Sequence, residues 1–537
     1  MNRTSASAAR DDAVTATTLE TSPAAKPAGR LLARNTVLNF IGQFLPAVVA
    51  LFTVPFVIHR LGAERFGVLS LVALVLGYFS LLDFGVGRAT TKFVAEALGK
   101  GESREQISRI FWTSLALQGV LGTLGGLLLC ASTPFLVRHV LTVPAELISQ
   151  SETVFLLCSI SVLVTLVTGT LSGLLEAHQR FDIVNALRTP STIATYALPV
   201  VVLLLGGGLP AIVICLTVKS IVFALIFFFY CGRLLAGGGP RAVDFRLAPT
   251  LFKFGSWLTA VYVLSAMVTY LDRFLIASRL STTAVTYYAP PYEIVSRLWI
   301  LPQSLFMTLF PAFAAMWGTQ RTDLERLFCR SFKYLVLSAS AAVALIIVLA
   351  HPLLLFWLGP EFAARSTLVL QLLAVGFLLN SQAWVPSTLL MSMGRPDLVA
   401  KLFLLEAPFY FVGAYWMIGK FGIVGAAAAW AIRGGVETII FFITCWRVAS
   451  FRSSMFIEQR VVRLLPPLLA LLVGVIPLRV AAAGQWWHGL GGVGWTALFA
   501  IVSFRFVLDR SERAAVTSPV MRFWRQRARL PEQDSDF

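Results

Sequence analysis

Long apolar runs recur along the whole chain, and short polar segments separate them. A helix needs about 20 apolar residues to cross the hydrocarbon core of a bilayer. Inside lipid every backbone N–H and C=O must find a partner within the protein, so such runs are expected to be helices. The sequence therefore predicts an all-α polytopic membrane protein with fourteen transmembrane helices. The runs cover residues 35–58, 66–87, 110–130, 153–175, 190–207, 209–231, 254–278, 285–316, 334–356, 367–392, 402–418, 422–445, 464–482 and 489–509.

The composition excludes an ordinary soluble protein. Hydrophobic residues make up 57% of the chain and charged residues only 13%, whereas about a quarter of a typical soluble domain is charged. The net charge of +17 would indicate a nucleic-acid partner in a soluble protein. Here membrane topology accounts for most of that charge, so no nucleic-acid partner is expected.

Basic residues are concentrated in every second segment between the predicted helices. Counting from the N-terminal tail, alternate segments hold 32 of the 44 Lys and Arg residues, the opposite segments hold 8, and 4 lie deep inside apolar runs. Cytoplasmic segments of membrane proteins are enriched in Lys and Arg. This bias predicts that both termini are cytoplasmic, and it supports the helix count because a missed helix would scramble the alternation.

The two halves of the chain match at an offset of about 215 residues. Six predicted helices separate the copies, an even number, so the copies have the same orientation. This predicts two parallel six-helix repeats, with two further helices at the C-terminal end. Substrate sites of secondary transporters often lie between such repeats, near the bilayer midplane. Matching pairs are Arg60 and Arg279, Arg180 and Arg395, Asp182 and Asp397, and Lys219 and Arg433.

The helices and repeats predict a domain organisation with two lobes and two tails. The expected parts are a disordered cytoplasmic tail (1–30), a first lobe (31–231), a cytoplasmic inter-lobe loop (232–253), a second lobe (254–445), two C-terminal spans (446–509) and a basic cytoplasmic tail (510–537).

Motifs of known catalytic or metal sites are missing from the sequence. It contains no P-loop, no HExxH and no GxSxG, and its five histidines are scattered. Polar segments between the predicted helices are too short to hold the soluble catalytic loop of a membrane polymerase or ligase. The six cysteines lie in or beside apolar runs without close pairing, so they are interpreted as free thiols. The sequence thus indicates a protein that is not an enzyme and that needs no cofactor or metal.

Two cations lie near the middle of predicted spans. Lys219 is central in run 209–231, and Arg433 is central in run 422–445. A charge at the bilayer centre costs about 2.5–3.5 kcal/mol on insertion scales, so such residues face the protein interior or a watery cavity. Glu437 follows Arg433 by one helical turn, whereas Lys219 has no acidic residue on its own helix. Each cation either ties two helices together through an acidic partner or lines a cavity that receives an anion.

Other charged residues lie nearer the ends of the predicted spans. Asp83 and Arg88 flank a glycine-rich segment, Asp272 lies in the outer part of run 254–278, and Glu293 and Arg297 share one helix face. These residues either form local salt bridges or make a coupling-ion site or a headgroup clamp. Four prolines in run 285–316 predict that this helix is bent.

Several segments resemble a known family. The first half reads Asn39-Phe-Ile-Gly42, Pro55, Leu61-Gly62, Phe66-Gly67 and Asp83-Phe84-Gly85, and the second half reads Asp272-Arg-Phe-Leu-Ile276, Tyr287-Tyr288 and Leu309-Phe310-Pro311. The chain in this respect resembles the Wzx/RfbX-type polysaccharide biosynthesis flippases of the multidrug/oligosaccharidyl-lipid/polysaccharide (MOP) exporter superfamily, over roughly residues 31–510. The second half departs from the Leu-Gly pattern, with Leu280-Ser281.

The resemblance implies a function. Such flippases move an undecaprenyl-pyrophosphate-linked oligosaccharide from the cytoplasmic to the periplasmic leaflet of the bacterial inner membrane. Their two six-helix lobes form a V around a cationic cavity, and their expected partners include polysaccharide polymerase and export proteins. By depth and repeat position, the candidate ligands of pyrophosphate and sugar are Lys219, Arg433, Arg297 and Arg88. The candidates for ion coupling or gating, with a proton or sodium gradient, are Asp83, Asp272, Glu293 and Glu437.

Two other functions remain open at the level of sequence. A cation-coupled multidrug antiporter of the same superfamily would favour acidic rather than basic residues at mid-membrane, so Lys219 and Arg433 count against it. An integral membrane enzyme would need catalytic groups that the short loops do not supply.

Overall fold

The computed structural model describes most of the helical part of the chain. The described residues are 45–46, 48–80, 83, 85–235, 242–247, 249, 271–318, 320–452, 454–471, 486–508 and 513. Within these residues the secondary structure consists of helices and turns, without a strand. The predicted tail 1–30, residues 254–270 of the seventh run and nearly all of the tail 510–537 lie outside them.

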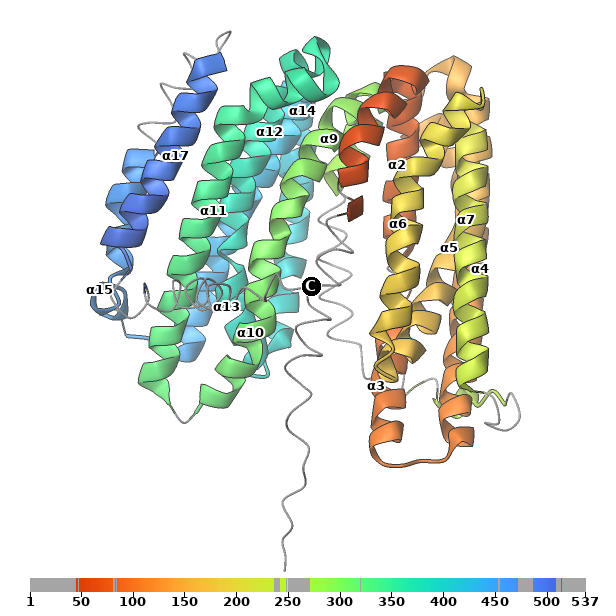
Figure 1. Ribbon diagram of the computed structural model, residues 1–537, viewed down its shortest axis with the longest axis horizontal. Coiled ribbons are helices and arrows are strands. Elements are labelled where there is room, and N and C mark those ends of the chain that lie inside the picture. Colours follow the sequence, from red (N-terminus) through yellow and green to blue (C-terminus); the bar gives the residue numbers. More distant parts are fainter. Residues whose placement is uncertain are drawn as a thin grey trace, which may run out of the picture.

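The first half of the chain forms a group of long helices (Figure 1). A π-helical turn (Leu136–Val140) and a 3₁₀ turn (Ala145–Leu147) link two of them. The helices are Val48–Leu61, α2 (Ala63–Ser80), α3 (Val86–Gly99), α4 (Arg104–Phe135), α5 (Ile148–Ala177), α6 (Phe181–Leu204) and α7 (Leu209–Leu234).

The second half forms a second group beside the first (Figure 1). It begins with helical residues 271–279. The helices that follow are α9 (Thr282–Ser296), α10 (Ile300–Met316), α11 (Arg321–Leu358), α12 (Pro360–Ser381), α13 (Trp384–Ser392), α14 (Pro396–Ala449), α15 (Met455–Glu458) and α17 (Trp486–Phe506).

Seven helical stretches among the described residues are long and apolar enough to cross a membrane. The number fourteen stays a prediction, although each predicted run contains described helical residues. Helix α14 contains the two predicted runs 402–418 and 422–445. Gly422, with a positive φ of 61°, interrupts the helix where the second run begins. Run 285–316 is interrupted, since the 3₁₀ turn Arg297–Trp299 separates α9 from α10.

One predicted loop is a helix. Residues 88–99 were expected to connect two spans, but they belong to α3, which continues the path of α2 after a break around Gly85. Gly85 has a φ of 72°, a left-handed conformation that glycine adopts without strain. The helix is amphipathic: Val86, Ala89 and Val94 are buried, while the exposed Lys100 and Glu96 pair at 2.8 Å. The charged residues of the exposed face make this segment polar on average, although its other face is apolar and buried.

Corresponding helices of the two halves pack against corresponding neighbours. In the first half α5 packs against α3, α4 and α7, and in the second half α12 packs against α9, α11 and α14. In each half the central helix comes after an interrupted helix (α2 and α3, or α9 and α10) and a long helix (α4 or α11). The helix packing around α5 and α12 is therefore alike.

The turns before α6 and α14 agree in detail at an offset of 215 residues. The Arg180 N–H donates to Leu175 O at 2.9 Å, and the Arg395 N–H donates to Leu390 O at 3.0 Å. Each arginine then pairs with the aspartate two residues later, at 3.0 and 3.1 Å. Both arginine side chains are exposed. At these residues the matching sequences form the same backbone hydrogen bond and the same ion pair.

The two groups of helices touch near the upper end of Figure 1, where α2 lies against α9. Gly67 permits this approach, since a Cβ there would overlap the carbonyl of Thr282. Backbone hydrogen bonds add to the contact: the Thr142 N–H donates to Ala277 O at 2.9 Å, and the Thr282 N–H donates to Thr142 O at 3.2 Å. We call these residues, Gly67, Thr142, Ala277 and Thr282, the outer contact.

Close helix packing in the second half yields a stability prediction. A Cβ at Gly376 of α12 would overlap the ring of Trp430 and lie 2.9 Å from Ala431 Cα. We expect Gly376→Ala to destabilise the protein by about 1–3 kcal/mol, because overpacking a tight contact forces the backbone apart. Gly413→Ala is the matched control, since no atom lies within 4 Å of its added methyl group. Thermal unfolding in detergent measures both, and equal midpoints would contradict the packing argument.

Candidate functional site

Lys219 lies on α7 and reaches toward α6. Its Nζ donates to Thr195 Oγ1 at 2.8 Å and to Ser191 O at 3.5 Å. The side chain is half-buried. Among the described residues no carboxylate lies within 4 Å of it, so its partners there are neutral oxygens. Of the two roles that the sequence left open, this geometry favours an unneutralised cation over a tie to an acidic residue.

The next residue of α6 connects the two halves of the protein. The Tyr196 hydroxyl accepts a hydrogen bond from Arg297 Nη2, across the interface, at 3.3 Å. Arg297 also lies 3.8 Å from Glu293, one turn earlier. Lys219 and Arg297, which are 78 positions apart in the sequence, thus contact adjacent residues of α6.

Exposure distinguishes this group from other charges in the spans. The side chains of Arg297 and Glu293 are 48% and 49% exposed, and Thr195 is exposed as well. An anion that enters between the halves can therefore reach Arg297 without disrupting a core. We call Lys219, Thr195, Tyr196, Glu293 and Arg297 the inter-half site.

Arg433 has the opposite environment, although the predicted repeat pairs it with Lys219. Its side chain is 7% exposed, and its Nη1 lies 3.4 Å from Glu406 and 3.1 Å from Glu437. Asn380 of α12 donates to the same Glu437 carboxylate. The guanidinium is therefore already paired, which is the structural tie that the sequence analysis held open.

Asp272 and Arg273 extend this buried group. Asp272 is fully buried and accepts hydrogen bonds from the Tyr288 hydroxyl and from the Arg273 backbone N–H. The Arg273 guanidinium lies 4.2 Å from the ring centroid of Tyr292 and 3.4 Å from Glu293. Glu293 thus joins the buried group to the inter-half site. We call Asp272, Arg273, Glu406, Arg433 and Glu437 the buried charge cluster.

Asp83 and Arg88 lie apart, in the first half. Asp83 is placed where α2 ends and α3 begins, and it accepts hydrogen bonds from the Gly87 N–H at 3.1 Å and from Gln118 of α4. Arg88 is exposed on the first turn of α3. Asp83 therefore stabilises the start of α3 inside the bundle. The sequence had placed both residues at the end of a span.

Removing Arg433 should destabilise the fold. The variant Arg433→Met would remove the buried guanidinium that pairs with Glu437 and contacts Glu406. Breaking a buried ion pair in this way costs about 3–5 kcal/mol. We expect a lower thermal midpoint and a lower abundance in membranes, measured by fluorescence-detected gel filtration. A variant as stable as the wild type would show that the cluster does not need its cation.

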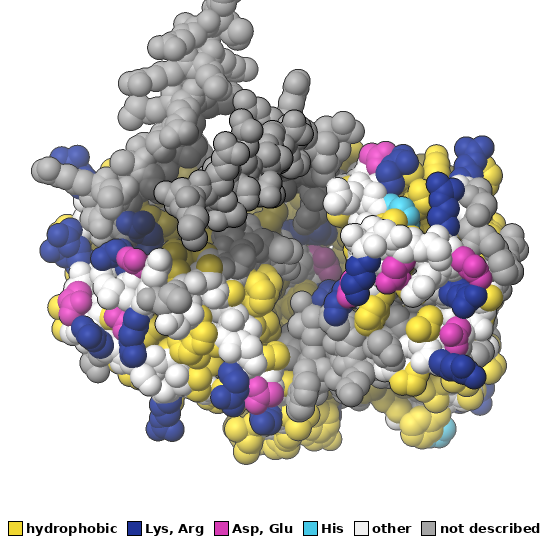
Figure 2. Space-filling model, turned by 90° about the horizontal axis from the view of Figure 1, so that it is seen from below, with side chains coloured by type: hydrophobic (Ala, Val, Ile, Leu, Met, Phe, Trp, Pro, Cys, Tyr) yellow, Lys and Arg dark blue, Asp and Glu magenta, His cyan; other side chains and the backbone are white. Residues whose placement is uncertain are grey.

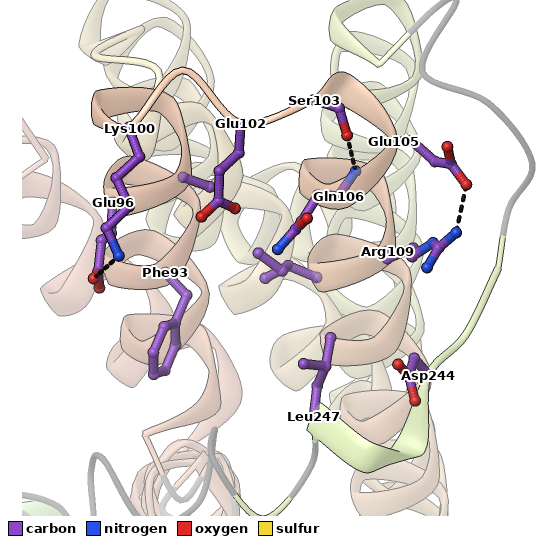
Figure 3. A pocket seen from close by; sticks show the side chains of 12 residues that line it. Phe93, Glu96, Lys100, Glu102, Ser103, Glu105, Gln106, Arg109, Asp244 and Leu247 are labelled. Carbon is purple, nitrogen blue, oxygen red and sulfur yellow. Dashed lines mark hydrogen bonds and ion pairs between the residues drawn. The ribbon is translucent and has the colours of Figure 1, made fainter.

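A surface groove lies elsewhere. A groove of about 440 Å³ is formed at the end of α3 and α4, near residues 244–247 (Figure 3). Its polar lining includes Glu96, Glu102, Glu105, Gln106, Arg109 and Asp244. None of the eight candidate residues lines it. Lys and Arg side chains gather over both groups of helices on the face that contains this turn (Figure 2). The groove therefore belongs to the basic face predicted to be cytoplasmic.

Glu406, Thr195 and Tyr196 lie with the candidates but were not predicted from the sequence. Glu406 is the only acidic residue of run 402–418, so a search for every charge inside a run would have found it. Thr195 and Tyr196 carry no comparable signal, because polar residues are common in spans. Among the described residues, no three His, Cys, Asp or Glu side chains form a metal site, and the six cysteines are free thiols.

Comparisons with known proteins agree on the family and the fold. Residues 32–317, more than half of the chain, match the family described as "Polysaccharide biosynthesis protein". A "Putative O-antigen transporter" of Shigella flexneri is 23% identical over 407 residues, which is 76% of this chain and 96% of the relative. The "Uncharacterized membrane protein EpsK" of Bacillus subtilis (strain 168) is 24% identical over 504 residues, 90% of this chain and 96% of the relative.

Solved structures of two transporters have the same fold. An inward-facing multidrug resistance MATE family transporter of the MOP superfamily superposes with a TM-score of 0.68 at 14% identity, covering 78% of this chain and 98% of the transporter. The lipid II flippase MurJ, in an inward closed conformation, gives a TM-score of 0.68 at 13% identity, covering 87% of this chain and 99% of the flippase.

Proposed function

Because the chain belongs to the polysaccharide biosynthesis protein family, within the MOP exporter superfamily, we propose that it flips a lipid-linked oligosaccharide across the bacterial inner membrane. The substrate is an undecaprenyl-pyrophosphate-linked glycan that moves from the cytoplasmic to the periplasmic leaflet. One observation carries the substrate class: Lys219 is a cation inside a span with only neutral oxygen partners among the described residues. An anionic headgroup between the halves would supply its missing counter-charge.

Lys219 and Arg297 are the proposed pyrophosphate ligands. They contact adjacent residues of α6 from opposite sides of the interface, and two separated cations suit a group that carries two phosphates. Arg297 can exchange partners easily, since its pair with Glu293 is long, at 3.8 Å, and half exposed. Arg433 is left out of this role because its guanidinium is buried and already pairs with Glu437, with Glu406 beside it. Arg88 is kept as a residue that receives the headgroup from the exposed face of α3.

We propose alternating access as the mechanism. The outer contact joins the halves at one end, and the basic turns lie at the opposite end, which the charge bias of the sequence assigns to the cytoplasm. In this conformation the inter-half site would open toward the cytoplasm, where the substrate is assembled. Parting of the outer contact, with the two lobes arranged as parallel six-helix repeats, would then release the substrate to the periplasm.

A multidrug antiporter is less well supported. A cationic drug needs accessible carboxylates, but Asp272, Glu406 and Glu437 are buried and have protein partners. Of the described acidic candidates in the second half, only Glu293 is accessible, and two arginines lie beside it. The excess of positive charge at the inter-half site therefore favours an anionic substrate over a cationic drug.

The test is the fate of lipid-linked glycans in a strain that lacks the gene. We expect complete repeat units to accumulate on isoprenoid lipid, inaccessible to a glycosidase added from the periplasmic side. The wild-type gene should reverse the accumulation. Unchanged lipid-linked glycan together with unchanged surface polysaccharide, in a strain without a second flippase gene, would refute the proposed function.

A further inference from the structure

The buried charge cluster does not balance if every member is ionised. Its five side chains are each 9% exposed or less. Three of them are carboxylates (Asp272, Glu406 and Glu437) and two are guanidiniums (Arg273 and Arg433). The exposed neighbours Glu293 and Arg297 pair with each other and add no net charge. Uncompensated charge inside a span is costly, so the cluster holds one proton when it is at rest.

Hydrogen-bond donors identify which carboxylate carries the proton. Asp272 accepts from the Tyr288 hydroxyl and from a backbone N–H at 2.7 Å. Glu437 accepts from Asn380 and lies 3.1 Å from Arg433. Donors of this kind stabilise an ionised carboxylate. Glu406 has a single described polar contact, with Arg433 at 3.4 Å, so it is the acid that gains least from ionisation.

We propose that Glu406 is the proton-binding site through which this flippase uses a proton gradient, a proposal that rests on the proposed function. Glu406 and Glu437 contact the same atom, Arg433 Nη1. Loss of the proton from Glu406 places two anions beside one cation. The repulsion between the two anions weakens the contact between the two parts of α14 that meet at Gly422. Loss of the proton would in this way drive the lobe movement.

The groups that face Glu406 also determine the nature of its ligand. Arg433 and Glu437 lie on its own helix beyond Gly422, and Asn380 reaches the pair from α12. Tyr410 lies one turn along, with its ring centroid 5.4 Å from the Arg433 guanidinium. Asp272 and Arg273 of residues 271–279, with Tyr288 and Tyr292 of α9, complete the surroundings. The guanidinium occupies the place between the two glutamates, so a proton rather than a sodium ion is the cation that the site takes.

Infrared spectroscopy on the purified full-length protein tests the proton directly, without a transport assay. We expect Glu406→Gln to remove a carboxylic-acid carbonyl band near neutral pH and to leave the thermal midpoint unchanged, because glutamine replaces a protonated glutamate isosterically. Glu96→Gln, at an exposed residue of α3, is the control that should leave the band in place. Arg433→Met should add a second acid band, since Glu437 then also binds a proton. A band that survives in Glu406→Gln would overturn the proposal.

Transport in sealed vesicles tests the use of the proton. A pH gradient should accelerate wild-type flipping of a fluorescent isoprenoid-pyrophosphate glycan several-fold, whereas Glu406→Gln should flip at a rate that ignores the gradient. A sodium gradient should change neither rate. A wild-type rate that ignores the pH gradient, or a Glu406→Gln rate that follows it, would overturn the proposal. Failure of the wild type to flip at all would refute the proposed function, while the infrared result would still decide the protonation of Glu406.

Discussion

Replacing Lys219 by methionine should slow glycan flipping strongly without lowering the amount of protein in the membrane. The methionine keeps the length and the apolar part of the side chain but removes the charge. A hydrogen bond to a charged group is worth about 1.5–3 kcal/mol, so we expect roughly a 10- to 100-fold slower rate at low substrate. The fold loses only contacts to Thr195 and Ser191, which remain exposed or partly exposed. Surface polysaccharide and accumulated lipid-linked glycan are the measurements.

Two further variants make this result interpretable. Lys219→Arg keeps a cation at the same depth and should restore most of the rate. Lys420→Met removes a lysine near the Gly422 break, where Lys420 lies over the Trp416 ring at 4.3 Å, and should be silent. If Lys219→Met loses abundance and thermal stability together, Lys219 is a structural tie after all, and the inter-half site no longer holds the pyrophosphate.

Locking the outer contact should stop transport reversibly. Thr142 Oγ1 donates to Ser278 O at 3.2 Å across the halves, so cysteines at Thr142 and Ser278 lie close enough for a short bifunctional thiosulfonate reagent. Alternating access requires this contact to part once in each cycle. A covalent link holds the protein in the conformation of this structure, and flipping should fall by about tenfold or more, because a locked equilibrium no longer populates the other state.

The double variant is built in a background that lacks the six native cysteines. Reduction of the link should restore transport, and the two single-cysteine variants treated with the same reagent should remain active. Full activity of the linked protein, with linkage verified by mass, would show that the halves need not separate at this end, and the alternating-access proposal would fail.

The sequence determined the class of the protein and the depth of its charges. Apolar runs are a local property of a helix in a bilayer, so they predicted a helical membrane protein without knowledge of packing, and they divided α14 into two runs on either side of its interruption at Gly422. They failed at α3, where charged residues on one face of an amphipathic helix were interpreted as a loop. The family resemblance, carried by short segments, predicted the membership that the comparisons confirmed.

Only the tertiary structure decided what each charge does. Lys219 and Arg433 have the same depth and the same repeat position, yet one contacts a threonine and the other lies between two glutamates. An ion pair depends on the distance between side chains on different helices, and that distance follows from how the helices pack. Glu406 precedes Arg433 by 27 residues, so the chain must turn at Gly422 before the two can meet. The sequence specifies which charges enter the membrane, and helix packing decides which of them are neutralised there.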